Sequence, residues 1–262
     1  MTQPNPNLHN PHLNGEPFFW QAGPIGILMV HGFTATPVEV RMVAERLHPR
    51  GYTVAAPLLP GHGTHPDDLN RTRWQDWVAA AEETYQQLRK TCQKVYLLGE
   101  SMGALVALAL AAEHREAEGV IASAPAIRLQ ISPVQKALLP VLSLFTPAVP
   151  KGGLDADSHW QGYPVNPLKG VQQLFLFQKE VERRLPEIVQ PVLVLMGRHD
   201  TTVHPDAGKI ILDRVSSTYK SLAWFEHSSH VILIDQEVDA ATERIERFIQ
   251  DTSNDGMPAM LS

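Results

Sequence analysis

The sequence contains one cysteine, Cys92, and no long unbroken run of apolar residues. A single thiol excludes an internal disulfide, so the composition does not indicate an oxidising compartment. The most apolar stretch, residues 131–149, is interrupted by three prolines, whereas a membrane-spanning helix needs about 20 apolar residues without such a break. We therefore expect no stable insertion into a membrane.

Charged residues are also sparse, and no stretch concentrates positive charge. They make up 19% of the 262 residues, hydrophobic residues make up 44%, and the formal net charge is -6, a balance typical of a folded protein. Because no basic stripe with interleaved aromatic residues is present, we expect no nucleic-acid partner. Residues 1–14 lack the basic-then-apolar pattern of a secretory signal, which makes the cytoplasm the expected location. The composition does not indicate an oligomeric state.

Apolar runs alternate between the strand and helix patterns along most of the chain. The expected strands are residues 18–22, 25–30, 52–56, 119–124, 192–196 and 221–225, with one more that begins at Lys94. The expected helices are residues 37–47, 74–88, 171–185, 205–215 and 237–249, with one more after Ser101. Such alternation is typical of the α/β class, in which helices cover both faces of a mostly parallel sheet. Ligands bind such sheets at the carboxyl ends of the strands.

The alternation stops where prolines and glycines become frequent. We interpret residues 126–170 as a cap inserted into one α/β core of residues 17–125 and 171–251, with flexible ends at residues 1–16 and 252–262. Within the cap, the apolar residues 138–145 either line an acyl-chain pocket or form the cap's own core, and the sequence leaves both readings open.

Two short patterns predict capped helix starts. Thr36 is followed by a proline and then by Glu39, and Thr72 is followed three residues later by Gln75. A hydroxyl followed three residues later by an acidic or amide side chain is the pattern of a capping box. We therefore expect Thr36 and Thr72 to cap the helices that follow them.

A Gly-x-Ser-x-Gly pattern lies between the strand that begins at Lys94 and the apolar helix after it, at Gly99, Ser101 and Gly103. This order of strand, tight turn and helix is the context in which the pattern marks a nucleophile. The turn forces the serine backbone into a strained conformation, so the residues two before and two after it must be very small. We therefore take Ser101 as the candidate nucleophile.

A serine hydroxyl needs a base to take its proton, and the base needs a carboxylate that fixes its tautomer. Asp200 lies in the loop directly after the expected strand 192–196, and His230 lies after the strand 221–225. The carboxyl ends of these strands share one edge of the sheet with Ser101. The chain order Ser, Asp, His is also the order of α/β-hydrolases.

Other residues compete for these two roles. The competitors are Asp206 and Asp213 for the carboxylate, and His199 and His227 for the base. Both competing aspartates fall in a helix, where a carboxylate usually faces solvent or caps the first turn, so Asp200 is preferred. His230 is preferred because it directly precedes the apolar run that enters the last helix.

The oxyanion that forms during ester attack needs two preorganised donors, usually backbone amides. One is expected at Met102, directly after the nucleophile. The other is expected at Phe33, in the loop after the strand 25–30. His31, in the same loop, is expected to brace the loop through hydrogen bonds rather than to transfer protons.

Together these motifs resemble those of serine α/β-hydrolases of the bacterial monoacylglycerol lipase and carboxylesterase type. The segments that carry the resemblance are His31-Gly32-Phe33-Thr34-Ala35-Thr36-Pro37, Leu59-Pro60-Gly61-His62-Gly63, Gly99-Glu100-Ser101-Met102-Gly103, Gly197-Arg198-His199-Asp200 and Ser229-His230-Val231. The resemblance implies a triad of Ser101, Asp200 and His230, a small cap, and no metal or organic cofactor. It also implies monoacylglycerols or short- to medium-chain acyl esters as substrates. Ala104 departs from the family, which often has a second glycine there.

We therefore expect a carboxylic ester hydrolase that works through an acyl-enzyme. The alternatives are an acyltransferase or another serine hydrolase on the same scaffold, and a non-catalytic ligand-binding protein that kept the fold. A serine at the turn argues against dehalogenase or epoxide hydrolase chemistry, which on this scaffold resembles aspartate-based systems. The five matching segments argue against a non-catalytic protein, while acyl-chain length and alcohol preference stay open.

Overall fold

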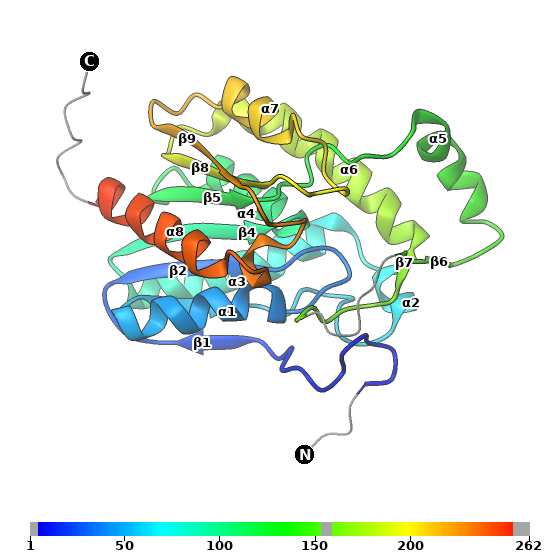
Figure 1. The fold of residues 1–262 in the computed structure, drawn as a ribbon, viewed down its shortest axis with the longest axis horizontal. Helices are drawn as coiled ribbons and strands as arrows, with labels where there is room; N and C mark the ends of the chain where they lie inside the picture. The colour runs from blue at the N-terminus through cyan, green and yellow to red at the C-terminus, as the bar shows by residue number, and fades with distance from the viewer. Residues whose placement is uncertain (1–4, 153–158, 254–262) are drawn as a thin grey trace.

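A seven-stranded sheet forms the centre of the computed structural model, which describes residues 5–152 and 159–253 (Figure 1). Its strand order is β1-β3-β2-β4-β5-β8-β9. The strands are β1 (Phe18–Trp20), β2 (Ile25–Val30), β3 (Thr53–Ala56), β4 (Lys94–Glu100), β5 (Gly119–Ser123), β8 (Val192–Gly197) and β9 (Lys220–Phe225). Only β1, at the edge, runs antiparallel to its neighbour among the strands of this sheet. The mostly parallel sheet expected from the sequence is confirmed.

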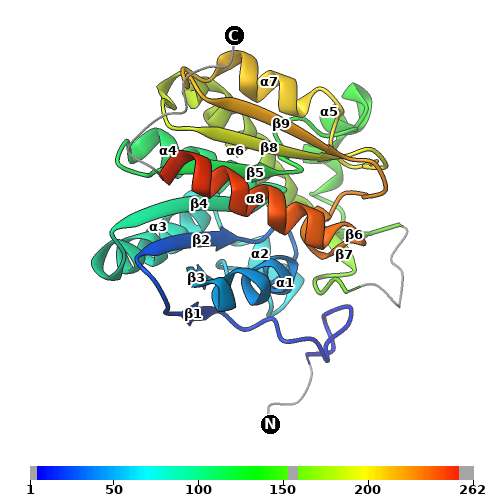
Figure 2. The same cartoon turned by 60° about the vertical axis from the view of Figure 1, so that its left-hand side comes forward.

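Helices cover both faces of the sheet, as Figures 1 and 2 show. On one face lie α1 (Val38–Leu47) and α8 (Val238–Ser253). On the other lie α3 (Trp74–Thr91), α4 (Met102–Glu113), α6 (Leu168–Arg184) and α7 (Ala207–Arg214). Short helical turns complete this part of the chain: α2 (Pro66–Leu69), η1 (His48–Arg50), η2 (Leu185–Glu187) and η3 (Ile232–Ile234).

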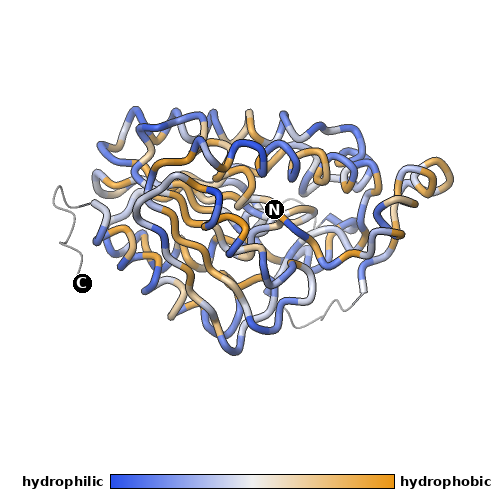
Figure 3. The backbone as a smooth tube through the Cα atoms, turned by 90° about the horizontal axis from the view of Figure 1, so that it is seen from above, coloured by the Kyte–Doolittle hydropathy of each residue, from blue (hydrophilic) through white to orange (hydrophobic). Residues whose placement is uncertain are grey.

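The central strands and helix α4 are apolar because they are buried from every side. All residues of β3, β5 and β8 are buried, and so is α4 from Met102 to Ala112. A helix that is apolar all round packs within a core rather than at its surface. In Figure 3 the tube is mostly orange, the colour of hydrophobic residues, in its interior. The nucleophile pattern between β4 and α4 therefore lies at the end of the middle strand of the sheet.

Between β5 and α6 the chain forms a separate layer beside the edge of the sheet where the strands end (Figure 1). It contains helix α5 (Pro133–Leu142) and a two-stranded antiparallel ribbon of β6 (Ala148–Pro150) and β7 (Val165–Pro167). Helix α5 was not expected. It begins with a capping box that the sequence reading overlooked, in which Ser132 and Gln135 each accept the other's backbone N–H.

Of the apolar residues 138–145, Leu139 alone fits the roles left open by the sequence, and it fits both, because it lines the cavity described below and belongs to the core of this layer. Leu139 is buried and packs against Leu168 and Phe175, the small core of this layer. The other large apolar side chains of the stretch face away from that core: Leu138, Val141, Leu142, Leu144 and Phe145 are 43–82% exposed. No helix in residues 5–152 or 159–253 is both long and apolar enough to cross a membrane.

Both predicted capping boxes are wrong. Helix α1 begins at Val38 without a side-chain cap, because the Thr36 hydroxyl donates to Gln161 and the Glu39 carboxylate accepts from the Gly32 N–H instead. Helix α3 begins at Trp74, with Arg73 rather than Thr72 in the cap position. The carboxylate of Asp76 accepts the Arg73 N–H, the bond that was predicted between Gln75 and Thr72.

The two ends of the chain were predicted to be flexible. In the described part of the first end, the Asn5 side chain donates to the Gly63 carbonyl and the His9 N–H donates to the Gly162 carbonyl. Helix α8 extends to Ser253, so the described part of the last segment is helical. Residues 1–4, 254–262 and the cap residues 153–158 lie outside the described part. The division into core and cap stays an interpretation.

The two glycines of the nucleophile turn stand where no side chain fits. A Cβ on Gly99 would lie 2.0 Å from the Gly103 carbonyl oxygen, and a Cβ on Gly103 would lie 2.0 Å from the Val30 carbonyl oxygen. Helix α4 therefore starts in direct contact with the ends of β2 and β4. This contact explains in physical terms why the pattern needs glycine at both positions.

Replacing Gly99 with alanine should destabilise the fold, because α4 must move away from β4 to admit the methyl group. We expect the Tm to fall by about 10 °C, as for a severe backbone clash in a chain of this size. Differential scanning calorimetry measures the shift. Gly152→Ala is the matched control, since a Cβ there meets nothing within 4 Å. Equal Tm values for the two variants would contradict the steric argument.

Candidate active site

Ser101 occupies the sharp turn between β4 and α4. Its backbone has φ 57° and ψ -112°, a conformation that residues other than glycine seldom adopt. Its Oγ lies 2.9 Å from Nε2 of His230, which follows β9 and precedes η3. The strained turn therefore holds the hydroxyl within hydrogen-bond distance of a histidine 129 residues later in the chain.

Asp200 completes a chain of hydrogen bonds with these two residues. Its Oδ2 lies 2.9 Å from Nδ1 of His230, and its Oδ1 accepts the N–H groups of Thr202 and Val203 at 2.7 and 2.9 Å. Burial by itself would raise the pKa of Asp200, but the bond and charge of His230 and these two amides hold the pKa below its ordinary value. The carboxylate is therefore fixed in its charged form beside the imidazole.

The structure thus brings Ser101, Asp200 and His230 together and leaves the competing residues apart. Asp213 pairs with Lys209 on the surface, and the side chains of His199 and His227 are exposed. Each of the preferred residues follows the carboxyl end of a parallel strand, β4, β8 or β9. The shared edge of the sheet, expected from the strand pattern, explains why residues so distant in sequence meet.

The two amides expected as oxyanion donors are free of backbone partners. Within residues 5–152 and 159–253, neither the Phe33 nor the Met102 N–H donates to a protein acceptor. The Met102 amide opens helix α4, whose first N–H groups have no partner within the helix. Both amides are therefore available to a bound group near Ser101.

His31 braces the loop that carries Phe33. Its Nε2 accepts the Leu59 N–H at 3.1 Å, and its Nδ1 lies 2.9 Å from the Gly32 carbonyl oxygen. This pattern fits a neutral imidazole that donates from Nδ1. Burial lowers the pKa of His31 to about 4, against the hydrogen bond to Gly32, which raises it. The side chain therefore stays neutral and structural, as expected.

A cavity of about 1180 Å³ opens beside Ser101 and His230. Most of its apolar wall comes from the layer between β5 and α6 and from α6 itself. These apolar residues are Ala126, Leu129, Ile131, Leu139, Val149, Leu168, Val171, Leu174 and Phe175. The cavity volume slightly exceeds the range of about 300–1,000 Å³ common for small-molecule pockets.

Within the described part of the chain, no three His, Cys, Asp or Glu side chains are grouped to hold a metal ion.

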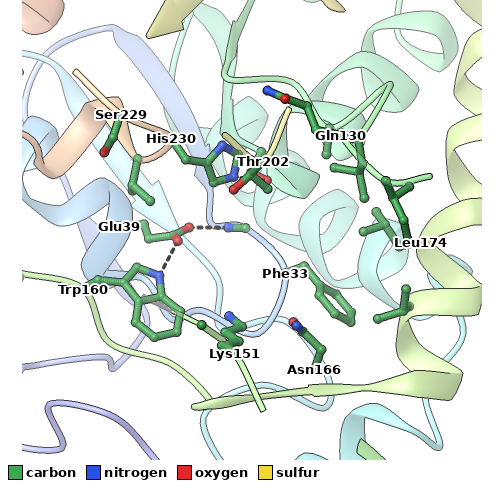
Figure 4. A pocket seen from close by; sticks show the side chains of 18 of the residues that line it. Phe33, Glu39, Gln130, Lys151, Trp160, Asn166, Leu174, Thr202, Ser229 and His230 are labelled. Atoms are coloured by element: carbon green, nitrogen blue, oxygen red, sulfur yellow. Dashed lines mark hydrogen bonds between the residues drawn. The ribbon is translucent and has the colours of Figure 1, made fainter. Parts of the chain in front are cut away.

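A polar wall that the sequence reading missed faces this cavity from the side of the Phe33 loop (Figure 4). The Glu39 carboxylate accepts the Gly32 N–H at 2.6 Å and the Trp160 Nε1–H at 2.7 Å. The Lys151 ammonium lies 4.3 Å from the centre of the Trp160 ring. The capping-box pattern gives no sign of this role, because one partner of Glu39 is the loop before α1 and the other, Trp160, lies 121 residues later.

A second buried acid lies directly before the nucleophile. Glu100 is fully buried, and within the described part of the chain its carboxylate oxygens make no hydrogen bond of good geometry. Burial and the nearby Glu39 and Asp200 carboxylates raise its pKa well above the ordinary value. Burial beside two other carboxylates therefore disfavours the charged form of this acid.

The fold and this site define an α/β-hydrolase. A family model described as serine aminopeptidase, S33, matches residues 25–237. The chain is 34% identical to a thermostable monoacylglycerol lipase of Bacillus sp. (strain H-257), over 89% of this chain and 94% of that protein. It is 28% identical to a carboxylesterase of Bacillus subtilis (strain 168), over 90% and 96% of the two chains.

Solved structures agree with this placement. One from a study of LipS and LipT, two metagenome-derived lipolytic enzymes, superposes with a TM-score of 0.86 at 30% identity, over 95% of this chain and all of that one. A monoacylglycerol lipase of Paleococcus ferrophilus shares the fold, with a TM-score of 0.73 at 22% identity over 90% and 99% of the chains. The chain belongs to the serine aminopeptidase S33 family of α/β-hydrolases. It is a serine ester hydrolase.

The neutral state of His31 predicts a pH-dependent loss of stability. Unfolded histidine binds a proton below about pH 6.5, whereas folded His31 binds one only near pH 4. The unfolded state therefore holds more protons between these values, so the free energy of unfolding falls as the pH drops from about 6.5 to 4. His31 alone contributes about 3 kcal/mol to this loss.

Urea unfolding at pH 7, 5.5 and 4 measures this dependence. His31→Gln should show a flatter dependence than the wild type, because it removes the titrating group and keeps an acceptor for the Leu59 N–H. His199→Gln, which replaces an exposed histidine, should keep the wild-type dependence. An unchanged slope in His31→Gln would show that the acid sensitivity arises elsewhere.

Proposed function

We propose that the protein hydrolyses monoacylglycerols or other esters of one short- to medium-length acyl chain, with Ser101 as nucleophile, His230 as general base and Asp200 as its orienting carboxylate. The observation that carries this proposal is the hydrogen-bond chain from Ser101 through His230 to Asp200 at the wall of a largely apolar cavity. A serine, a base and a third group that orients the base are the parts of nucleophilic acyl transfer.

The geometry supports a two-step mechanism. His230 takes the proton of Ser101 as Oγ attacks the ester carbonyl, and the charge on the carbonyl oxygen is stabilised by the Phe33 and Met102 amides. His230 then returns the proton to the departing alcohol, which leaves an acyl group on Ser101. Water attacks this acyl-enzyme with the same base, and the acid is released. Asp200 holds His230 in the required tautomer throughout.

The two walls of the cavity support the choice of substrate. The apolar wall is suited to an acyl chain, and the polar wall at Glu39, Lys151 and Trp160 is suited to an alcohol with hydroxyl groups. The relatives named as monoacylglycerol lipase and carboxylesterase align over nearly the whole chain, which supports the same substrate class. The cytoplasmic location expected from the sequence stays a prediction.

Ser101→Ala should lower kcat for p-nitrophenyl butyrate and for a monoacylglycerol by at least about 1,000-fold, because removal of a triad nucleophile leaves only binding and oxyanion stabilisation. Intact mass spectrometry after treatment with a fluorophosphonate should show one adduct on the wild type and none on the variant. Circular dichroism is the control for folding. Substantial turnover by the folded variant would refute the assignment of Ser101.

Leu139→Trp should shorten the acyl chain that the enzyme accepts, because Leu139 is the buried residue of α5 that lines the cavity. We expect kcat/KM for p-nitrophenyl palmitate to fall about tenfold or more while that for the acetate changes little, as for added bulk in a packed pocket. Leu138→Trp is the matched control, since Leu138 is 57% exposed. A similar loss in both variants, or for both esters, would argue against this wall as the acyl site.

A further inference from the structure

The loop that carries the Phe33 amide is held from two sides. We call residues 32–34 the oxyanion loop. Thr34 has a φ of 66°, in the left-handed region that residues other than glycine adopt at a cost of about 1–3 kcal/mol. A loop in this conformation persists only if surrounding contacts hold it. His31 and the Ala35 N–H hold the Gly32 carbonyl, and further contacts come from α1 on one side and from the layer of β6 and β7 on the other.

Glu39 of α1 holds the first residue of the oxyanion loop. Its Oε2 accepts the Gly32 N–H at 2.6 Å, and its Oε1 accepts the indole N–H of Trp160 at 2.7 Å (Figure 4). Glu39 as a whole is 3% exposed. The peptide that follows Gly32 carries the Phe33 N–H, so the bond to Glu39 restricts the direction in which that donor points.

Lys151, directly after β6, holds the last residue of the loop. Its ammonium donates to the Thr34 hydroxyl, which in turn donates to the Phe33 carbonyl oxygen at 2.5 Å. The Tyr163 N–H, just before β7, donates to the Thr34 carbonyl oxygen at 2.9 Å. The peptides on both sides of the Phe33 N–H are therefore fixed, one by Glu39 and one through Lys151.

The two side chains also balance each other's charge. Burial raises the pKa of Glu39, and that rise is opposed by the hydrogen bonds from Gly32 and Trp160 and then by the charge interactions with His230 and Lys151. Burial lowers the pKa of Lys151 to about 8, and the negative charge of Glu39 opposes that fall. Both groups contact Trp160, so the opposite charges lie on one ring beside the oxyanion loop.

We propose that Glu39 and Lys151 are paired positioning residues of the oxyanion hole, through which the layer of β6 and β7 sets the activity of Ser101. Glu39 orients the loop, but its negative charge alone would oppose the negative charge that develops on the substrate oxygen. Lys151 offsets that charge and fixes the Thr34 end of the loop. This inference rests on the proposed function, because the oxyanion loop matters only if Ser101 attacks a carbonyl.

A double-mutant cycle tests the pairing. Lys151→Met should lower kcat for p-nitrophenyl butyrate by about 10- to 100-fold with KM changed less than about twofold, because the defect lies in the charged transition state. Glu39→Gln should lower kcat about tenfold, because an amide has one acceptor oxygen for two N–H donors. The double variant should lose less than the product of the two single losses, because part of the Lys151→Met loss arises from the uncompensated charge of Glu39, which the double variant lacks.

The inhibition constant Ki of a trifluoromethyl ketone tests the oxyanion hole directly, apart from general damage to the fold. The ketone forms an oxyanion on Ser101, so its Ki should rise in Lys151→Met by the same factor as kcat/KM falls. Lys136→Met is the matched control, because the Lys136 ammonium also lies 4.3 Å from a ring centre, that of Phe175, and Lys136 belongs to α5 rather than to the segment that holds the oxyanion loop. Its kcat and Ki should stay within about twofold of the wild type.

The wild type is measured first, so that failure of this inference and failure of the proposed function are distinguished. No wild-type turnover and no fluorophosphonate adduct would remove the proposed function itself. With an active wild type, the pairing is refuted if the losses of the two single variants multiply. It is also refuted if Lys151→Met changes only KM, if its Ki for the ketone is unchanged, or if Lys136→Met loses as much activity.

Discussion

The site depends on the contact between the start of α4 and the ends of β2 and β4. Gly99 and Gly103 let backbones meet where a methyl group would lie 2.0 Å from a carbonyl oxygen. That closeness forces Ser101 into its strained conformation and exposes the free amide of Met102 at the start of α4. The other components then arrive from the neighbouring strands β2, β8 and β9, whose carboxyl ends lie along the same edge of the sheet.

Most of the core could be predicted from the sequence because its signals are local. Continuous apolar runs mark the buried strands, and the glycines of the nucleophile turn stand two residues on each side of Ser101. The order of the parallel strands then places Asp200 and His230 at the edge where Ser101 lies. The preference for these two residues over their competitors agrees with the hydrogen bonds that the structure contains.

The parts that could not be predicted depend on partners far along the chain. Glu39 matches the third position of a capping box, but it bonds to Trp160, 121 residues later. Nothing local to Lys151 indicates that it reaches Thr34, 117 residues earlier. Helix α5 was overlooked because Pro140 lies within it and because most of its apolar side chains face outward. Where tertiary contacts outweigh local preference, pattern alone is insufficient.

The hydrogen bonds between the oxyanion loop and the layer of β6 and β7 have a consequence for changes in substrate range among such enzymes. Residues 126–170, interpreted as the cap, follow β5 and end within α6. Lys151 and Trp160 lie inside it, while Glu39 lies outside. A transplanted segment without a matching cation would bring a new acyl wall and leave a buried carboxylate uncompensated. Under the proposed pairing, substrate range and catalytic rate would be linked at these residues.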